Sequence, residues 1–229
     1  MRVAPVTAAT AQTHQYPINV DLRDQSVLVV GGGRVAAHKV AGLIRAGARV
    51  TVVAPDADRA IGTDRGVRWH RREYQRGEAA SYRLVITATS DSAVNEQVFR
   101  DGEAANVMVN SADDPERCRF TMPSVARHGD VQVTVSTNGR SPALAAWLRR
   151  QVSAGLGPEV EALLELLEAA RVELRAGSGS SEHEGWSAAL DDGLLELIRS
   201  DRHHDARVRL RAHLNLPPEP AGSQMEDAR

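Results

Sequence analysis

A glycine-rich turn between an apolar strand and a helix constrains this chain more than any other feature. The run Gly31-Gly32-Gly33-Arg34-Val35-Ala36 directly follows the apolar residues 27–30 and opens a helical pattern. Backbone N–H groups of such a turn, together with the dipole of the following helix, favour an anion. Gly31, Gly33 and Ala36 fit the pattern G-x-G-x-x-A, which makes the turn, admits a pyrophosphate and allows close packing. The sequence therefore predicts a dinucleotide-binding turn.

The residues after this turn predict alternating helices and strands. Apolar residues recur at helical spacing over residues 35–46, Gly47 is a helix stop, and residues 49–54 form a second apolar strand. Strand, helix and strand within about 30 residues make a right-handed parallel βαβ unit. Further strands are predicted over 67–70, 82–89 and 106–111, and a further helix over 92–105. We therefore expect an α/β fold with a Rossmann-type parallel sheet.

The pattern changes after Pro115. Residues 119–125 and 130–136 are both strand-like and a short turn separates them, which predicts a hairpin rather than another βαβ unit. Ser141 then caps a helix that runs through residue 152, with Pro142 at the first helical position.

The remaining chain is predicted to be helical. Residues 155–158 interrupt the preceding helix, residues 159–176 are amphipathic, and residues 177–181 read as a flexible Gly/Ser linker. One or two more helices are expected within 186–211, and the Pro-rich, charged residues 217–229 are expected to be disordered.

Composition and charge exclude several classes of protein. The 229 residues carry a net charge of −2, are 42% hydrophobic and 25% charged, and show no basic excess for nucleic acid. Cys118 is the only cysteine, which excludes an internal disulfide, and the histidines lack metal-ligand spacing. No apolar run approaches the roughly 20 residues that span a bilayer, and residues 1–15 lack a secretory signal pattern. We expect a cytoplasmic protein with neither a membrane nor a nucleic-acid partner, and no metal site.

Two acidic segments are candidates for chemistry, and each has an alternative interpretation. The second strand ends in Ala54-Pro55, so Asp56 lies two residues after the usual place of a ribose-binding acid; it is either a ribose contact or a turn residue. No arginine cluster stands there for a 2′-phosphate, which favours NAD over NADP. Asp113-Asp114-Pro115 follows a strand at the edge where open parallel sheets hold ligands. A carboxylate there is either a general base or part of a turn.

Several short motifs together resemble one family. They are Tyr16-Pro17-Ile18, Leu22-Arg23-Asp24, Val29-Val30-Gly31-Gly32-Gly33-Arg34-Val35-Ala36 with Lys39, Gly47-Ala48-Arg49-Val50-Thr51-Val52-Val53-Ala54-Pro55, Ala88-Thr89-Ser90-Asp91 with Val94-Asn95, Val109-Asn110 with Asp113, Phe120-Thr121-Met122-Pro123-Ser124, and Ser136-Thr137-Asn138-Gly139-Arg140-Ser141-Pro142-Ala143-Leu144-Ala145. They occur in family order and at near-family spacing over residues 16–157. The chain resembles the precorrin-2 dehydrogenases, many of which are also sirohydrochlorin ferrochelatases. These are the siroheme synthase N-terminal module and its stand-alone relatives.

The resemblance implies a function and an organisation. The family oxidises precorrin-2 to sirohydrochlorin with NAD in siroheme biosynthesis, and bifunctional members then insert ferrous iron. A tetrapyrrole substrate and a homodimer that shapes its cleft are implied. The implied domains are a flexible lead over 1–15, an NAD-binding Rossmann domain over 16–115, a dimerisation hairpin and helix over 116–157, a helical domain over 158–216, and a disordered tail over 217–229.

The resemblance also implies roles for individual residues. Asp113 matches the catalytic aspartate, the proton acceptor in both reactions, and we expect burial to raise the pKa of its carboxyl. The implied cofactor contacts are Gly31, Gly33, Arg34, Val35, Pro55 and Asp56, with Thr89 at the nicotinamide end. The expected substrate contacts are Asn110, Ser124 and Arg140, with Arg149 and Arg150 as further candidates whose alternative is a solvated surface.

Three functions remain open at this point. The first is a bifunctional dehydrogenase and chelatase, and the second is a dehydrogenase alone. The third is a module that senses NAD without catalysis. The block around Asp113 argues against the third, because a sensor needs no active-site aspartate.

Overall fold

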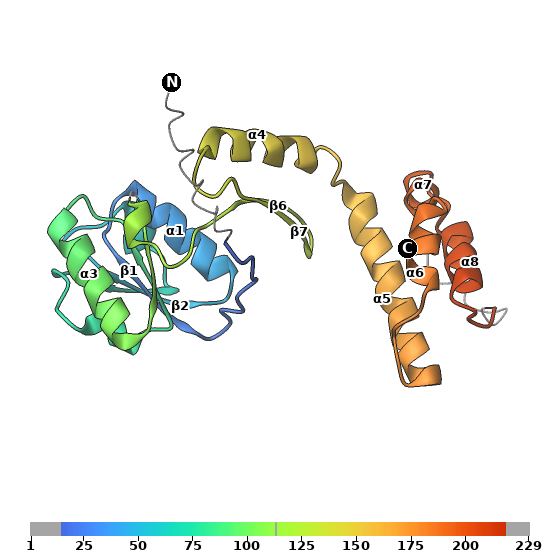
Figure 1. Ribbon diagram of the computed structural model, residues 1–229, viewed down its shortest axis with the longest axis horizontal. Helices are drawn as coiled ribbons and strands as arrows, with labels where there is room; N and C mark the ends of the chain where they lie inside the picture. The colour runs from blue at the N-terminus through green and yellow to red at the C-terminus, as the bar shows by residue number, and fades with distance from the viewer. Residues whose placement is uncertain (1–14, 113, 219–229) are drawn as a thin grey trace, which may run out of the picture. The chain divides into compact units, whose positions relative to one another are not determined.

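The computed structural model describes residues 15–112 and 114–218 of the chain, which form two compact units (Figure 1). The first unit comprises the chain up to Met122 together with the separate short segment Asn138–Arg140. The second unit comprises Pro123–Thr137 and the chain from Ser141 onward. The expected lead over 1–15 and tail over 217–229 lie almost wholly outside the described residues. The expected domain boundaries remain predictions.

Five parallel strands form the sheet of the first unit, in the order β3-β2-β1-β4-β5. They are β1 (Ser26–Val30), β2 (Arg49–Val53), β3 (Val67–His70), β4 (Leu84–Thr87) and β5 (Met108–Ser111). The sheet grows in one direction from β1 to β3, and the chain then crosses back to place β4 on the other side of β1. This order confirms the predicted Rossmann-type fold and makes the β1–β4 junction its topological switch point.

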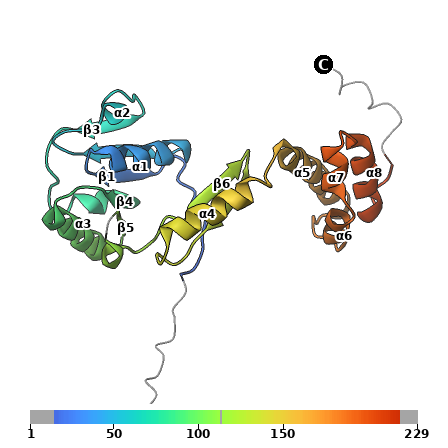
Figure 2. The ribbon, with the colours of Figure 1, turned by 90° about the horizontal axis from the view of Figure 1, so that it is seen from above.

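Helices cover both faces of the sheet, which explains the continuous apolar strands. Val27 and Val29 pack with helix α1 (Arg34–Arg45) and helix α2 (Arg59–Gly62) in one core. The alternate residues of β1, Leu28 and Val30, pack in a second core with helix α3 (Ser92–Ala105) and the 3₁₀ turn η1 (Glu78–Ser81). Figure 2 shows α1 and α3 on opposite sides of β1 and β4.

The second unit begins with a hairpin of β6 (Ser124–His128) and β7 (Val131–Val135), against which α4 (Pro142–Ser153) packs. Ser141 caps α4 as predicted, because its Oγ accepts a hydrogen bond from the N–H of Leu144 at 3.2 Å. The prediction of a strand over 119–125 is wrong. Arg119 donates its backbone N–H to Val109 O at 2.8 Å, and Phe120 O accepts from Asn110, so this segment is bound beside β5 and the hairpin strand begins only at Ser124.

Four helices complete the second unit around a core of mainly leucine and alanine side chains, together with Ile198. They are α5 (Pro158–Ser178), α6 (Gly185–Asp191), α7 (Leu194–Arg199) and α8 (His203–His213). The predicted linker start at Gly177 is wrong, because α5 continues to Ser178 and ends at Gly179, whose φ of 75° suits a helix C-terminus. The prediction of at most two later helices is also wrong, since Gly193 and Asp201, both at positive φ, divide the segment into three.

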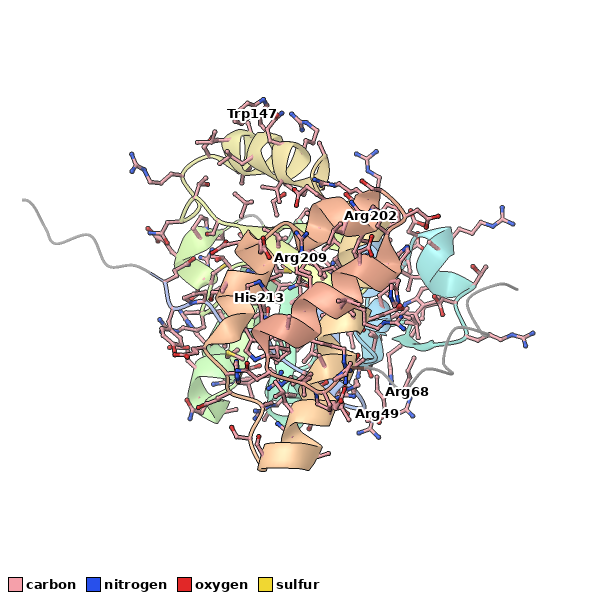
Figure 3. The ribbon with its side chains drawn as sticks, turned by 90° about the vertical axis from the view of Figure 1, so that its right-hand side faces the viewer. Arg49, Arg68, Trp147, Arg202, Arg209 and His213 are labelled. Atoms are coloured by element: carbon pink, nitrogen blue, oxygen red, sulfur yellow. The ribbon has the colours of Figure 1, made fainter. Side chains whose placement is uncertain are left out.

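Two side chains on the last turns of α8 contact Asp192, the C-cap residue of α6. Arg209 and His213 project from the same face of α8 (Figure 3), and their Nε and Nε2 atoms lie 3.6 and 3.0 Å from Asp192 Oδ2. The hydrogen bond from His213 is the main reason why the pKa of Asp192 is lowered. Within the described ranges, no helix has both the length and the apolar character needed to cross a membrane.

A buried carboxylate ties α3 to the crossover between β3 and β4. Asp101, which is 9% exposed, accepts hydrogen bonds from Tyr74 OH at 2.8 Å, Gly77 N at 2.6 Å and Gln97 Nε2 at 2.7 Å. Burial alone would raise the pKa of Asp101, but these three bonds outweigh it and the pKa lies below its usual value.

Replacing Asp101 by Ala tests this connection. Because three donors would lose their acceptor, we expect the free energy of unfolding at neutral pH to fall by about 2–4 kcal/mol. The pKa of Asp101 is lower in the folded protein than in the unfolded chain. Its carboxylate therefore stabilises the folded state fully at pH values above the unfolded pKa, and this stabilisation is lost as the pH falls through the folded pKa. Denaturant titrations of both proteins should show the difference shrinking below about pH 4. A difference that is constant with pH would contradict the assignment.

Candidate functional site

The glycine turn lies where three strand ends converge. A Cβ atom at Gly31, whose φ is 115°, would lie 2.4 Å from Ala88 O, beyond β4. A Cβ atom at Gly32 would lie 2.0 Å from Asp56 O, beyond β2. The N–H of Gly31 also donates to Val53 O at 3.0 Å. These contacts require glycine at both positions, because any side chain would overlap backbone atoms.

Gly33 faces open space instead. No described atom would lie within 4 Å of a Cβ at this position, and the residue has ordinary extended backbone angles of −73° and −176°. Gly33 is the N-cap of α1, yet no described side chain caps that helix, and its first turn contains no acidic residue. By contrast, Asp58 and Asp91 accept N–H bonds at the starts of α2 and α3. The uncapped N–H groups of α1 and the space beside them fit a phosphate group.

The loop after β2 closes one side of the turn. Asp58 donates its N–H to Gly32 O at 2.7 Å, while its Oδ1 accepts from Ala60 N at 2.9 Å. Sequence reasoning missed Asp58, although an acidic residue before a short helix is a typical N-cap. Pro55 and Asp56 are exposed, and Asp56 Oδ1 accepts from Ala57 N at 2.9 Å. This bond is the turn interaction considered for Asp56; its ribose contact stays a prediction.

The loop after β4 closes the other side. Thr89 Oγ1 accepts from Asp91 N at 3.1 Å, and Thr89 O accepts from Asn95 Nδ2 at 3.0 Å. Asn95 was given no role from the sequence, and the N-cap at Asp91 is the signal that places it on the first turn of α3. Thr89 is thus held next to the glycine turn, because the preceding residue, Ala88, contacts Gly31. Arg34 and Val35 are exposed at the first turn of α1.

The third loop at this edge follows β5. Asp113, the predicted catalytic residue, lies outside the described residues. Its neighbour Asp114 accepts a bond from Glu116 N at 3.0 Å and caps the 3₁₀ turn η2 (Pro115–Arg117), so the turn interpretation holds for Asp114. Asn110 is 5% exposed and donates to Phe120 O at 2.8 Å, while its Oδ1 has no hydrogen-bond partner among the described residues.

The other predicted substrate contacts lie elsewhere. Ser124 is half-buried at the start of β6 in the second unit, whereas Arg140 is exposed and grouped with the first unit. Arg149 is half-buried and Arg150 is exposed on α4. Their roles toward a substrate remain predictions. The described residues contain no group of three or more His, Cys, Asp or Glu side chains that could hold a metal ion.

Two family models match the chain. Residues 18–124 match the family described as "Putative NAD(P)-binding", and residues 128–154 match "Sirohaem biosynthesis protein central". The first match covers the Rossmann-type sheet and the glycine turn. The second covers the last residue of β6, the whole of β7 and α4. The fold and the glycine turn therefore define a protein of the Rossmann type, whose first unit is similar to the NAD(P)-binding family.

Relatives of known name narrow this class. The siroheme synthase of Nitrosococcus oceani is 37% identical over 207 residues, which are 87% of this chain and 44% of that protein. The siroheme synthase of Actinobacillus succinogenes is 32% identical over 207 residues, 88% of this chain and 44% of that protein. A solved structure named "SirC, precorrin-2 dehydrogenase" has a TM-score of 0.62 at 25% identity, and the match covers 88% of this chain and 98% of that one.

These matches confirm the resemblance to the family of siroheme synthase N-terminal modules and stand-alone precorrin-2 dehydrogenases. The chain spans less than half the length of the two siroheme synthases named above.

The open space at Gly33 allows a direct test of the phosphate site. In Gly33→Asp, a carboxylate at the N-cap would repel a pyrophosphate, and we expect NAD affinity to fall about a hundredfold. The same carboxylate would cap α1, so stability should stay equal or rise by a few tenths of a kcal/mol. Isothermal titration and denaturant unfolding measure the two effects.

The neutral variant Gly33→Asn is the matched control for this test. It offers a similar cap and size without the charge, so it should retain more affinity than Gly33→Asp. Unchanged NAD affinity in both variants would refute the phosphate site.

Proposed function

We propose that this chain oxidises precorrin-2 to sirohydrochlorin, with NAD as the hydride acceptor, in siroheme biosynthesis. The observation that carries the proposal is the uncapped start of α1 at the switch point of the sheet. It occurs in a chain that is similar over 88% of its length to a structure named as a precorrin-2 dehydrogenase. The expected cytoplasmic location goes with this proposal.

Several described residues support the proposed cofactor contacts. The N–H groups at the start of α1 would bind the pyrophosphate, because a helix N-terminus attracts anions. Asp56 and Thr89, in the loops after β2 and β4, are the proposed contacts of the ribose and the nicotinamide. NAD, when bound, would accept the hydride from the substrate. The absence of an arginine cluster after β2 in the sequence favours NAD over NADP.

The proton of the dehydrogenation needs a separate acceptor. Removal of two hydrogen atoms as a hydride and a proton leaves the proton to a base, and the proposed base is Asp113. The described neighbours of Asp113 lie beyond the carboxyl end of β5, and ligands of open α/β sheets bind at this edge. Asn110, Ser124 and Arg140 are the proposed contacts of the tetrapyrrole, whose carboxylates favour arginine partners.

Insertion of ferrous iron is the second proposed activity, with iron as a substrate. The relatives named siroheme synthase favour it, since siroheme is the product of metallation. Loss of the pyrrole protons during metallation would use the same acceptor, Asp113. Dehydrogenation without metallation and NAD sensing without catalysis are the alternatives that experiment must separate.

One set of absorbance measurements distinguishes these functions. We expect the protein with precorrin-2 and NAD to form sirohydrochlorin, and addition of ferrous iron to form siroheme. Asp113→Ala should lose the first step by about a hundredfold or more while keeping its NAD affinity, because the base is separate from the phosphate site. If the protein forms sirohydrochlorin but not siroheme, it is a dehydrogenase without chelatase activity. If the wild type causes no spectral change, the dehydrogenase proposal fails and NAD sensing is the function that stays open. Normal turnover by Asp113→Ala would refute the assignment of Asp113 as the base.

The proposed active form is a homodimer. Support comes from the hairpin of β6 and β7, which within the described chain is a sheet of only two strands and is marginal alone. In addition, α4 leaves two large apolar side chains about half exposed, Leu144 at 48% and Trp147 at 49%.

Trp147→Glu is the corresponding test. A charge on this exposed apolar face should weaken association by about tenfold or more, measured by sedimentation equilibrium. The control is Val172→Glu on α5, an apolar residue that is 65% exposed outside the hairpin and α4. A wild type that sediments as a monomer, or a Trp147→Glu protein that associates as tightly as the wild type, would contradict this surface.

A further inference from the structure

In the loop after β5, one sulfur atom contacts the backbone at two separate points. Cys118 Sγ accepts a hydrogen bond from Ser111 N at 3.3 Å and lies 3.2 Å from two acceptors, Ser111 O and Asp114 O. One thiol therefore contacts backbone atoms on both sides of residue 113. Burial raises the pKa of the Cys118 thiol, so the group stays protonated and keeps its donor at neutral pH.

A buried side-chain amide on β5 donates a hydrogen bond to this sulfur atom. Asn110 Nδ2 donates to Cys118 Sγ at 3.4 Å and to Phe120 O at 2.8 Å. Because Asn110 lies on β5 and is 5% exposed, it connects the loop to the buried parallel sheet of the first unit. Cys118 and Asn110, with the bonds just described, are called the thiol clasp below.

Three further contacts hold the same loop. Ala112 N donates to Thr87 O at 2.9 Å, at the end of β4. Arg117 Nε lies 2.6 Å from Glu96 Oε2 on α3, and Arg117 also pairs with Asp114. The described residues on either side of position 113 are therefore fixed to two strands and one helix.

We propose that Cys118 is a positioning residue for the dehydrogenation, whose thiol holds the loop that carries Asp113. The inference rests on the proposed function, because it takes Asp113 as the proton acceptor. Its physical basis is that a base must lie within hydrogen-bond reach of the proton it removes. Loosening the backbone beside it by as little as 1 Å is enough to slow a reaction about a hundredfold.

The chemistry of the clasp predicts an order among three side chains. The thiol of Cys118 both donates and accepts, and the hydroxyl in Cys118→Ser does the same with a shorter bond to Cβ. The methyl group in Cys118→Ala does neither, so Ser111 N and the amide of Asn110 would lose an acceptor. The serine variant should therefore rescue what the alanine variant loses.

Steady-state kinetics with precorrin-2 and NAD test the inference. For Cys118→Ala we expect kcat to fall about tenfold to a hundredfold, while KM for NAD and the NAD affinity stay within about twofold because the glycine turn is untouched. Cys118→Ser should recover most of the lost kcat. Equal kcat for the wild type and Cys118→Ala would overturn the proposal, as would a serine variant no better than the alanine variant.

A matched core variant separates positioning from general loss of stability. Val98→Ala removes a fully buried side chain from α3 in the same unit, and Val98 contributes no bond to the clasp. Val98→Ala should lower the unfolding midpoint and leave kcat within about twofold at a temperature where it remains folded. A fall in kcat for Val98→Ala as large as that for Cys118→Ala would show a structural effect and overturn the proposal.

Hydrogen exchange gives a readout that needs no activity. In the wild type the Ser111 amide is bonded to sulfur, so peptides spanning residues 110–120 should exchange faster in Cys118→Ala, while peptides of the glycine turn should not change. Unchanged exchange in the loop would overturn the clasp. If the wild type fails to oxidise precorrin-2, the proposed function fails and the positioning role fails with it. If the wild type is active, Asp113→Ala inactive and Cys118→Ala fully active, only this inference fails.

Discussion

The close approach of three chain segments beyond the end of β1 is the constraint on which the rest of the site depends. Gly31 lets the carbonyl of Ala88 come near, and Gly32 does the same for the carbonyl of Asp56. A side chain at either position would separate the loops that follow β2 and β4. The two glycines are therefore required by packing, and they leave Gly33 and the uncapped start of α1 facing open space.

Neighbouring glycines of this turn serve different purposes: two are required by packing within the protein, and the third leaves space for a ligand. Gly31 and Gly32 are needed by the protein itself, because backbone atoms occupy the place of a side chain. Gly33 is not needed for that reason, since its angles suit any residue and no described atom would lie within 4 Å of a Cβ atom there. A helix start without a cap is a site of unsatisfied N–H groups, and an anion satisfies them. The match of residues 18–124 to an NAD(P)-binding family agrees with this interpretation.

Beside this site, the loop after β5 is organised differently. The loops after β2 and β4 approach the glycine turn through the backbone carbonyls of Asp56 and Ala88, whereas Cys118 Sγ contacts backbone atoms on both sides of the β5 loop. Composition predicted for Cys118 only what it could not do, namely form an internal disulfide or a cysteine cluster with zinc. Its contacts with residues four to eight positions earlier depend on how the chain folds back from η2 toward β5. No periodicity in the sequence encodes that path.

Most of the fold could be predicted from the sequence, because its elements obey local rules. The apolar runs of β1, β2 and β4 predicted buried parallel strands, and Ser141-Pro142 predicted the start of α4. The errors have two causes. Arg119 donates to Val109, a contact between separate segments that delays the start of β6, whereas local backbone turns at positive-φ residues such as Gly193 divide the last helices. The turn bond of Asp56 and the cap at Asp58 also required the folded loop to be seen.

By itself, the sequence determined the parallel sheet, the glycine turn and the resemblance to one family, since these follow from side-chain periodicity and from motifs within short segments. Only the tertiary structure decided which glycines are required by packing, which carboxylates serve as caps, and which atoms Cys118 contacts. The physical reason is that these properties depend on distances between segments that the strand order brings together. Hydrophobic patterning specifies which faces are buried, but contacts between loops are specified by the hydrogen bonds that form once those faces have packed.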